Sequence, residues 1–90
     1  MVRWSQSGEG MLMNPEEIEV CEKLGIEVCN RLTKIREEKG VSKNELSQRS
    51  GLSRSAILKI ERGERRATLP TLYRIAKSLD VELWKVLKGV

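Results

Sequence analysis

The stretch SKNELSQRSGLSRSAILKIERG, residues 42–63, decides the fold, because it holds two short helical patterns separated by one glycine. Ser42 can cap the first helix through its hydroxyl, and Glu45 three residues later completes a capping box. Gly51 has no Cβ and can take the positive φ that ends a helix. Ser53 can then cap the second helix. The stretch therefore predicts two helices joined by a tight turn.

The two predicted helices have distinct apolar and polar sides. The inward positions are Leu46 and Ser50 on the first helix, Leu52 in the turn, and Ala56, Ile57 and Ile60 on the second. The other side of the second helix is polar. It carries Arg54, Ser55 and Lys59, near the start and along the outer face. Side chains so placed can reach base edges in the major groove of DNA, and we expect these three to read bases directly.

This segment resembles the helix-turn-helix of the phage repressor, Cro and Xre-like regulators. The similarity covers residues 28–87 and includes the pattern LxxxxGLSxxxIxxIExG, which runs from Leu46 to Gly63. It also includes IREEKG, which ends at Gly40, and LPTLYRIAKSLDV, which starts at Leu69. The resemblance implies an all-α, compact, five-helix, lambda-repressor-like bundle that binds double-stranded DNA.

The resemblance also assigns roles to individual residues. Arg54, Ser55 and Lys59 match base-reading positions, whereas Arg36 and Glu61 match a structural ion pair. We expect phosphate contacts from Ser42, Lys43, Arg62, Arg65 and Arg66. Lys43 departs from the family, which usually has glutamine there to brace the first base-reading side chain. Because lysine supplies no hydrogen-bond acceptor, the base preference cannot be inferred from relatives.

Charge is distributed unevenly along the 90 residues. Residues 1–30 hold two basic and six acidic side chains, a net charge of −4, whereas residues 31–90 hold fifteen basic and seven acidic, a net charge of +8. A basic segment favours a polyanionic partner, although such a run can also be an ordinary solvated surface. The placement of Arg65 and Arg66 after Gly63, just beyond the second helix, favours phosphate contact.

The chain before the motif predicts a leader and a helical extension. Residues 1–13 are rich in Gly, Ser and Met and are expected to be a disordered leader, since they lack the apolar core of a signal peptide. Asn14, Pro15 and Glu17 predict a helix start. Residues 14–27 form an extension, followed by a DNA-binding domain over 28–90. Whether one helix continues through Gly25 is open, because an interior glycine costs about 1 kcal/mol. The extension either covers an edge of the bundle or contributes to a dimer contact.

The last third of the chain predicts further core and a dimer surface. The helical stripe consists of Leu72, Ile75, Ala76 and Leu79, and Asp80 can cap a final helix. Tyr73 either supports the core edge, which we favour, or contacts a phosphate through its hydroxyl. Val81, Leu83, Val86 and Leu87 offer more apolar surface than one side of a short helix can bury inward. Trp84 is either a core residue or an interface residue. Relatives in this family commonly dimerise through their final helix, so the candidate dimer contacts are Val81, Trp84 and Leu87. We expect a homodimer on a pseudo-palindromic operator.

Enzymatic functions are disfavoured by composition. The chain has no histidine, which removes His-based acid–base chemistry and His-containing zinc sites. Cys21 and Cys29 would lie about 12 Å apart on one helix, too far for a disulfide, and are expected to be buried or half-buried packing residues. We expect no metal, no cofactor and a cytoplasmic, non-membrane protein. The competing function is a protein-interaction module, such as an antitoxin or a coactivator-like adaptor. A restriction-modification controller protein is a third possibility.

Overall fold

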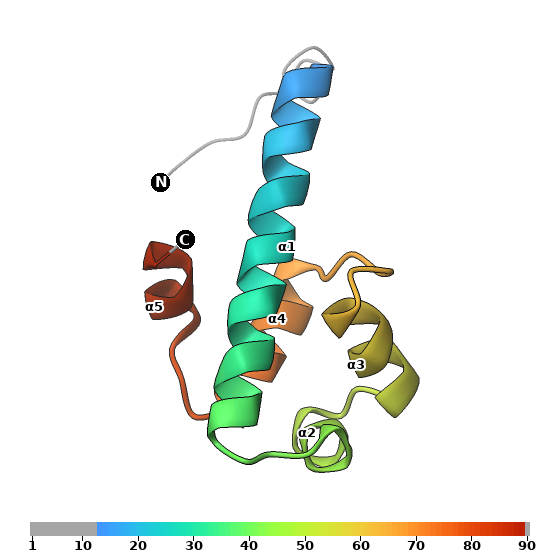
Figure 1. Cartoon of the computed structure of the whole chain (residues 1–90), viewed down its shortest axis with the longest axis vertical. Coiled ribbons are helices and arrows are strands. Elements are labelled where there is room, and N and C mark those ends of the chain that lie inside the picture. Colours follow the sequence, from blue (N-terminus) through green and yellow to red (C-terminus); the bar gives the residue numbers. More distant parts are fainter. Residues whose placement is uncertain (1–12, 90) are drawn as a thin grey trace.

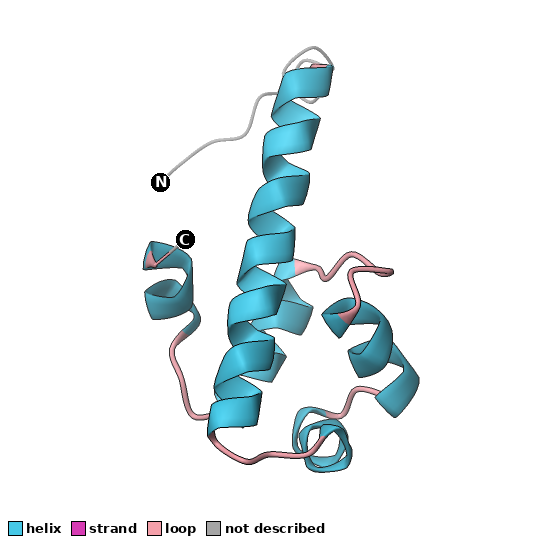
Figure 2. Ribbon diagram, viewed as in Figure 1, coloured by secondary structure: helices cyan, strands magenta, loops and turns pink. Residues whose placement is uncertain are grey.

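The computed structural model of the chain describes residues 13–89, and every regular element in that range is an α-helix. The five helices are α1 (Pro15–Glu38), α2 (Lys43–Ser50), α3 (Arg54–Glu61), α4 (Leu69–Ser78) and α5 (Leu83–Lys88), as Figures 1 and 2 show. The predicted all-α, five-helix architecture is confirmed. The predicted leader lies, apart from Met13, outside the described residues.

Helix α1 is a single helix of 24 residues that passes through Gly25 without a break. It begins at the predicted capping box, in which Asn14 accepts from the Glu17 amide at 2.8 Å and the Glu17 carboxylate accepts from the Asn14 amide at 2.9 Å. Its first half projects beyond the other helices (Figure 1). Although α1 is long, neither it nor any other helix in residues 13–89 is long and apolar enough to cross a membrane.

The hydrophobic core lies between the second half of α1 and the four shorter helices. Helix α1 contacts α3, α4 and α5, and α2 packs on both α3 and α4. Aliphatic side chains from all five helices fill the space. The buried cluster consists of Val28, Leu32, Val41, Leu46, Ile57, Ile60, Leu72, Ile75, Ala76, Leu79 and Val86.

The apolar side chains of α1 are buried only in its second half. Val28 and Leu32 are core residues, and Ile35 packs half-buried against them. Ile18 and Cys21 lie on the same helix but are exposed, because no other described helix reaches the first half of α1. The prediction that Cys21 is a packing residue is therefore wrong, whereas Cys29 is half-buried as expected.

Two predictions for the last third of the chain are also wrong. Asp80 does not cap α5: it has a left-handed φ of +57°, and the cap position falls on Glu82, whose side chain makes no capping hydrogen bond. Asp80 instead closes the turn after α4, where an aspartate tolerates positive φ better than most residues. Tyr73 does not support the core edge, since α4 turns it outward and leaves it exposed.

Candidate nucleic-acid interface

Helix α3 presents one buried and one open face. Ala56, Ile57 and Ile60 are buried against the core, and the face is anchored on α1 and α2. Arg54, Ser55 and Lys59 are all exposed on the remaining surface, which we call the recognition face. Nothing in residues 13–89 covers these three side chains, so the face predicted to enter a groove is free to do so.

Hydrogen bonds fix the turn that sets α3 at an angle to α2. Gly51 has a φ of +77°, in the left-handed region that ends α2. The Ser47 hydroxyl donates to the Leu52 carbonyl at 2.5 Å. The Ser50 hydroxyl donates to the Leu46 carbonyl at 2.6 Å and accepts from the Leu52 amide at 3.2 Å. Because both serines of α2 hold Leu52, the orientation of α3 is closely constrained.

The start of each of the two helices is capped by a serine. Ser42 accepts from the Glu45 amide at 3.0 Å, in the capping box predicted for α2. Ser53 accepts from the Ala56 amide at 3.0 Å at the start of α3. The Ser42 hydroxyl can still donate a hydrogen bond outward, because capping uses it only as an acceptor. Lys43 is half-exposed beside it.

A basic loop follows α3 and folds back on the helix end. Gly63 has a φ of +75°, and the Glu64 amide donates to the Lys59 carbonyl at 2.8 Å. This return places three exposed arginines at one end of the recognition face, namely Arg62, Arg65 and Arg66. The loop and the first turn of α2 thus supply all five residues predicted to contact phosphate.

Arg66 is not free in this structure. Its guanidinium contacts the Glu22 carboxylate of the α1 extension, which lies 44 positions earlier in the chain. Both side chains remain partly exposed, so the pair can open at little energetic cost. Sequence reasoning missed this contact because no local pattern links residues so far apart. The opposite charges of the two segments were the only available signal.

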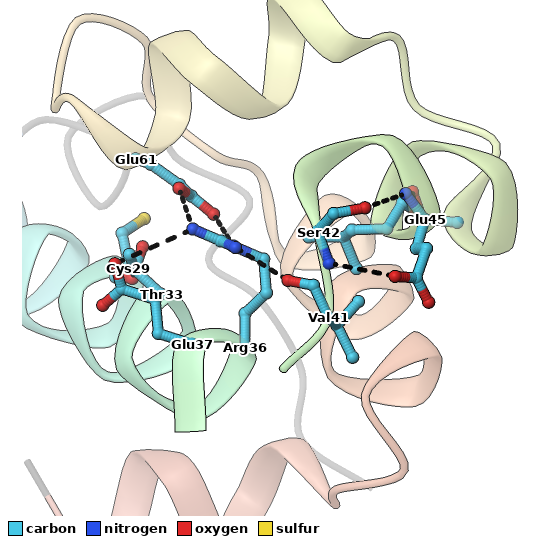
Figure 3. A network of polar contacts seen from close by, with 10 residues as sticks. Cys29, Thr33, Arg36, Glu37, Val41, Ser42, Glu45 and Glu61 are labelled. Atoms are coloured by element: carbon cyan, nitrogen blue, oxygen red, sulfur yellow. Dashed lines mark hydrogen bonds and ion pairs between the residues drawn. The ribbon is translucent and has the colours of Figure 1, made fainter. Parts of the chain in front are cut away.

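Arg36 and Glu61 form a buried ion pair that ties α1 to the end of α3 (Figure 3). Arg36 Nε donates to one Glu61 oxygen at 2.8 Å and Nη2 to the other at 3.1 Å. Arg36 Nη1 donates to the Val41 carbonyl at 2.8 Å, just before α2. The side chains are only 9% and 11% exposed. One guanidinium therefore links α1, the loop before α2 and the end of α3, the helix that carries the recognition face.

The residues predicted to form a dimer contact lie around α5. Val81 is half-buried, whereas Trp84 and Leu87 are exposed, so Trp84 is not a core residue. Val86 is the member of α5 that enters the core. Helix α5 lies on the opposite side of α1 from α3 (Figure 1), and the two short helices make no contact within residues 13–89.

The remaining candidates for chemistry are the two cysteines of α1. Cys21 and Cys29 are both free thiols. Burial raises the pKa of the Cys29 thiol, because desolvation disfavours the thiolate. Within residues 13–89 no three potential metal ligands among His, Cys, Asp and Glu come together.

The arrangement of α2 and α3 defines a helix-turn-helix domain, and comparison with known proteins agrees. Residues 32–83, more than half of the chain, match the HTH_3 family model, described as helix-turn-helix. The chain belongs to this family. It is 39% identical over 54 residues to the HTH-type transcriptional regulator y4dJ of Sinorhizobium fredii (strain NBRC 101917 / NGR234). The matched segment covers 60% of this chain and 70% of that protein.

Solved structures of restriction-modification controller proteins are also similar. C.AhdI from Aeromonas hydrophila is 34% identical with a TM-score of 0.64, and the match covers 71% of this chain and 96% of that one. C.Esp1396I, solved as a tetramer with its natural 35 base-pair operator, is 35% identical with a TM-score of 0.67. That match covers 73% of this chain and 91% of the controller.

Proposed function

We propose that this protein is a sequence-specific, double-stranded-DNA-binding transcriptional regulator. The observation that carries the proposal is the open polar face of α3, which stands beside a basic loop on a rigid helix-turn-helix. The family assignment and the similarity to a controller solved on its operator support it. They favour DNA binding over the protein-interaction alternative. Such a regulator acts inside the cell, where the DNA is.

In this proposal the bases are read directly by three side chains, those of Arg54, Ser55 and Lys59. Arg54 opens α3, and its planar guanidinium can donate two hydrogen bonds to the O6 and N7 atoms of one guanine. Ser55 can donate to or accept from a base edge. Lys59, one turn further along the exposed face, can donate to guanine acceptors. The three side chains thus address neighbouring positions in one major groove.

In this proposal five residues bind the phosphate backbone of DNA, namely Ser42, Lys43, Arg62, Arg65 and Arg66. They flank the recognition face at the start of α2 and in the loop after α3. Contacts from these positions orient α3 without distinguishing bases. Each cationic contact releases condensed counterions and steepens the fall of log K with log salt by roughly 0.9. Lys43 serves here as a phosphate contact, in place of the glutamine that is usual in the family.

The protein acts as a homodimer in this proposal. One α3 of eight residues touches few base pairs, so a single copy has limited selectivity. Two copies related by a twofold axis place their recognition helices in successive major grooves, with half-sites about 34 Å apart. The corresponding operator is pseudo-palindromic.

The proposal is tested by selecting bound sequences from random duplexes and then measuring affinity by fluorescence anisotropy. We expect Arg54→Ala to weaken binding to the selected site by about 1–3 kcal/mol and to relax preference at one base pair per half-site. Lys77→Ala is the charge-matched control. Lys77 lies near the end of α4 beside Arg49 and Ser78, away from the recognition face, and its loss should change affinity little.

One result would count against the proposed function, and another against the role assigned to Arg54. Selection that recovers no enriched sequence would remove sequence specificity. An equal loss of affinity from Arg54→Ala on every duplex would make Arg54 a phosphate contact and leave base reading to Ser55 and Lys59.

A further inference from the structure

The α1 extension carries an apolar strip that nothing in residues 13–89 covers. Val20 and Leu24 are 55% and 48% exposed, one helical turn apart. Arg31 follows seven residues after Leu24 and therefore shares their side of the helix. Its guanidinium contacts the Gly89 carbonyl, at the end of α5. Val20 and Leu24 thus continue the same side of α1 that α5 covers further along.

Helix α5 presents a second apolar surface next to this strip. Trp84 and Leu87 are 57% and 42% exposed. Helix α5 has only six residues and is roughly 9 Å long. A stable interface buries about 800 Å² on each partner, which is more than so short a helix supplies by itself. The side of the α1 extension from Pro15 to Glu27 adds roughly 20 Å of helix to the available surface.

Charge identifies the partner for this combined surface. Residues 15–27 of the extension hold five glutamates and one lysine, a net charge of −4. Residues 82–88 hold Lys85 and Lys88 and one acidic residue, Glu82, which pairs with Lys85 at 3.6 Å, so this segment has a net charge of +1. Two extensions placed side by side would repel each other. An extension placed on the α5 of a second copy joins opposite charges around an apolar centre.

We propose that two copies of this chain cross, so that Val20 and Leu24 of each pack against Trp84 and Leu87 of the other. The contact is isologous, because each copy contributes both halves of the surface. It deepens the proposed homodimer by assigning a role to the extension, which precedes the region matched by the family model. Since α5 and α3 lie on opposite sides of α1, the crossed dimer leaves both recognition faces open (Figure 1).

Two double variants of the full chain test the strip. Val20→Glu with Leu24→Glu places charge on the proposed contact. Ile18→Glu with Ile26→Glu places the same charge on the other side of the same helix, at two exposed positions that border a groove next to the α3–α4 loop. By analytical ultracentrifugation we expect the first variant to raise the dimer Kd at least tenfold and the second to change it less than about twofold. Circular dichroism verifies that both remain helical.

A charge exchange tests the crossing itself. Glu27 shares the side of Val20 and Leu24, at helical spacings of seven and three. Glu27→Lys and Lys88→Glu should each weaken the dimer, whereas the two combined should restore it, because every extension then meets an α5 of opposite charge. Restoration supports the crossed arrangement. A combined variant weaker than either single variant would overturn it.

The inference can fail without the proposed function failing. If Val20→Glu with Leu24→Glu leaves the dimer Kd unchanged, the extension is not part of the interface, while duplex selection with the wild-type chain can still recover an operator. Conversely, a crossed dimer that binds no duplex would overturn the regulatory function and leave the interface in place.

Discussion

At the scale of single residues, the Arg36–Glu61 pair best links sequence to site geometry. It lies at the junction of α1, the loop before α2 and the end of α3, and it is nearly excluded from water. Burying two charges is costly unless they pair and saturate their hydrogen bonds. Arg36 satisfies this condition by donating to Glu61 and to the Val41 carbonyl. We therefore expect the pair to fix the position of α3 more than it raises the free energy of unfolding.

This view predicts an asymmetry between single and double substitutions. Glu61→Ala leaves a buried guanidinium without its carboxylate, and we expect a loss of about 3–5 kcal/mol in the free energy of unfolding. Arg36→Met combined with Glu61→Leu removes both charges and keeps apolar volume, so it should be far less destabilising than Glu61→Ala. Urea denaturation followed by circular dichroism measures both. A double variant as unstable as the single one would show that the pair itself provides the stability.

The two cysteines predict a difference in reactivity. Cys21 is exposed, whereas Cys29 is half-buried and has a raised pKa. A raised pKa reduces the thiolate fraction below that pKa, so Cys29 should react more slowly with iodoacetamide at pH 8 and accelerate as the pH rises towards it. Mass spectrometry of Cys21→Ser and Cys29→Ser proteins assigns each rate. Faster labelling of Cys29 than of Cys21 would contradict the burial of this side of α1.

At the scale of secondary-structure elements, Gly25 and Gly51 both have room for a side chain, but alanine should have opposite effects on stability at the two positions. An added Cβ would meet no atom within 4 Å at either Gly25 or Gly51. Gly25 lies inside α1, where alanine is favoured by about 1 kcal/mol. Gly51 has a φ of +77°, where a Cβ clashes with its own backbone at a cost of roughly 1–2 kcal/mol. Backbone conformation, rather than space, separates the two positions.

Gly25→Ala should therefore raise the unfolding free energy by about 1 kcal/mol, and Gly51→Ala should lower it by roughly 1–2 kcal/mol. Thermal and urea unfolding report both changes. Gly51→Asn is a useful comparison, because asparagine tolerates positive φ better than alanine and should recover part of the loss. Equal effects at the two positions would indicate that α1 bends at Gly25.

The elements also show how far sequence reasoning reaches. The capping boxes at Asn14 and Ser42 and the left-handed Gly51 were predictable because their signals lie within a few residues. Asp80 and Tyr73 were assigned wrongly because their roles depend on where the chain turns and which face of α4 meets the core. Contacts across long separations, such as that between Glu22 and Arg66, follow from tertiary packing and leave no local pattern.

At the scale of the whole molecule, an acidic and a basic segment lie side by side. The acidic extension forms the first half of α1, and the basic loop after α3 contacts it, so the Glu22 carboxylate pairs with the guanidinium that we assign to phosphate. Carboxylate and phosphate oxygens make the same kind of charge-assisted hydrogen bond with arginine. If Arg66 contacts a phosphate as we propose, Glu22 competes with that phosphate for the guanidinium. We therefore expect the extension to lower the non-specific affinity for DNA.

Removing this competition should strengthen DNA binding. An exposed pair contributes up to about 1 kcal/mol, so we expect Glu22→Gln to tighten binding by up to roughly fivefold per copy at low salt. The gain should shrink as salt screens the pair. Fluorescence anisotropy over a salt series measures it. Glu19→Gln is the control, because Glu19 pairs with Lys23 at 3.1 Å within α1, and its loss changes the same net charge without freeing Arg66. Equal gains in affinity from both variants would show that the change in net charge, rather than the release of Arg66, causes the effect. Weaker binding by Glu22→Gln would mean that Glu22 positions Arg66 for the phosphate.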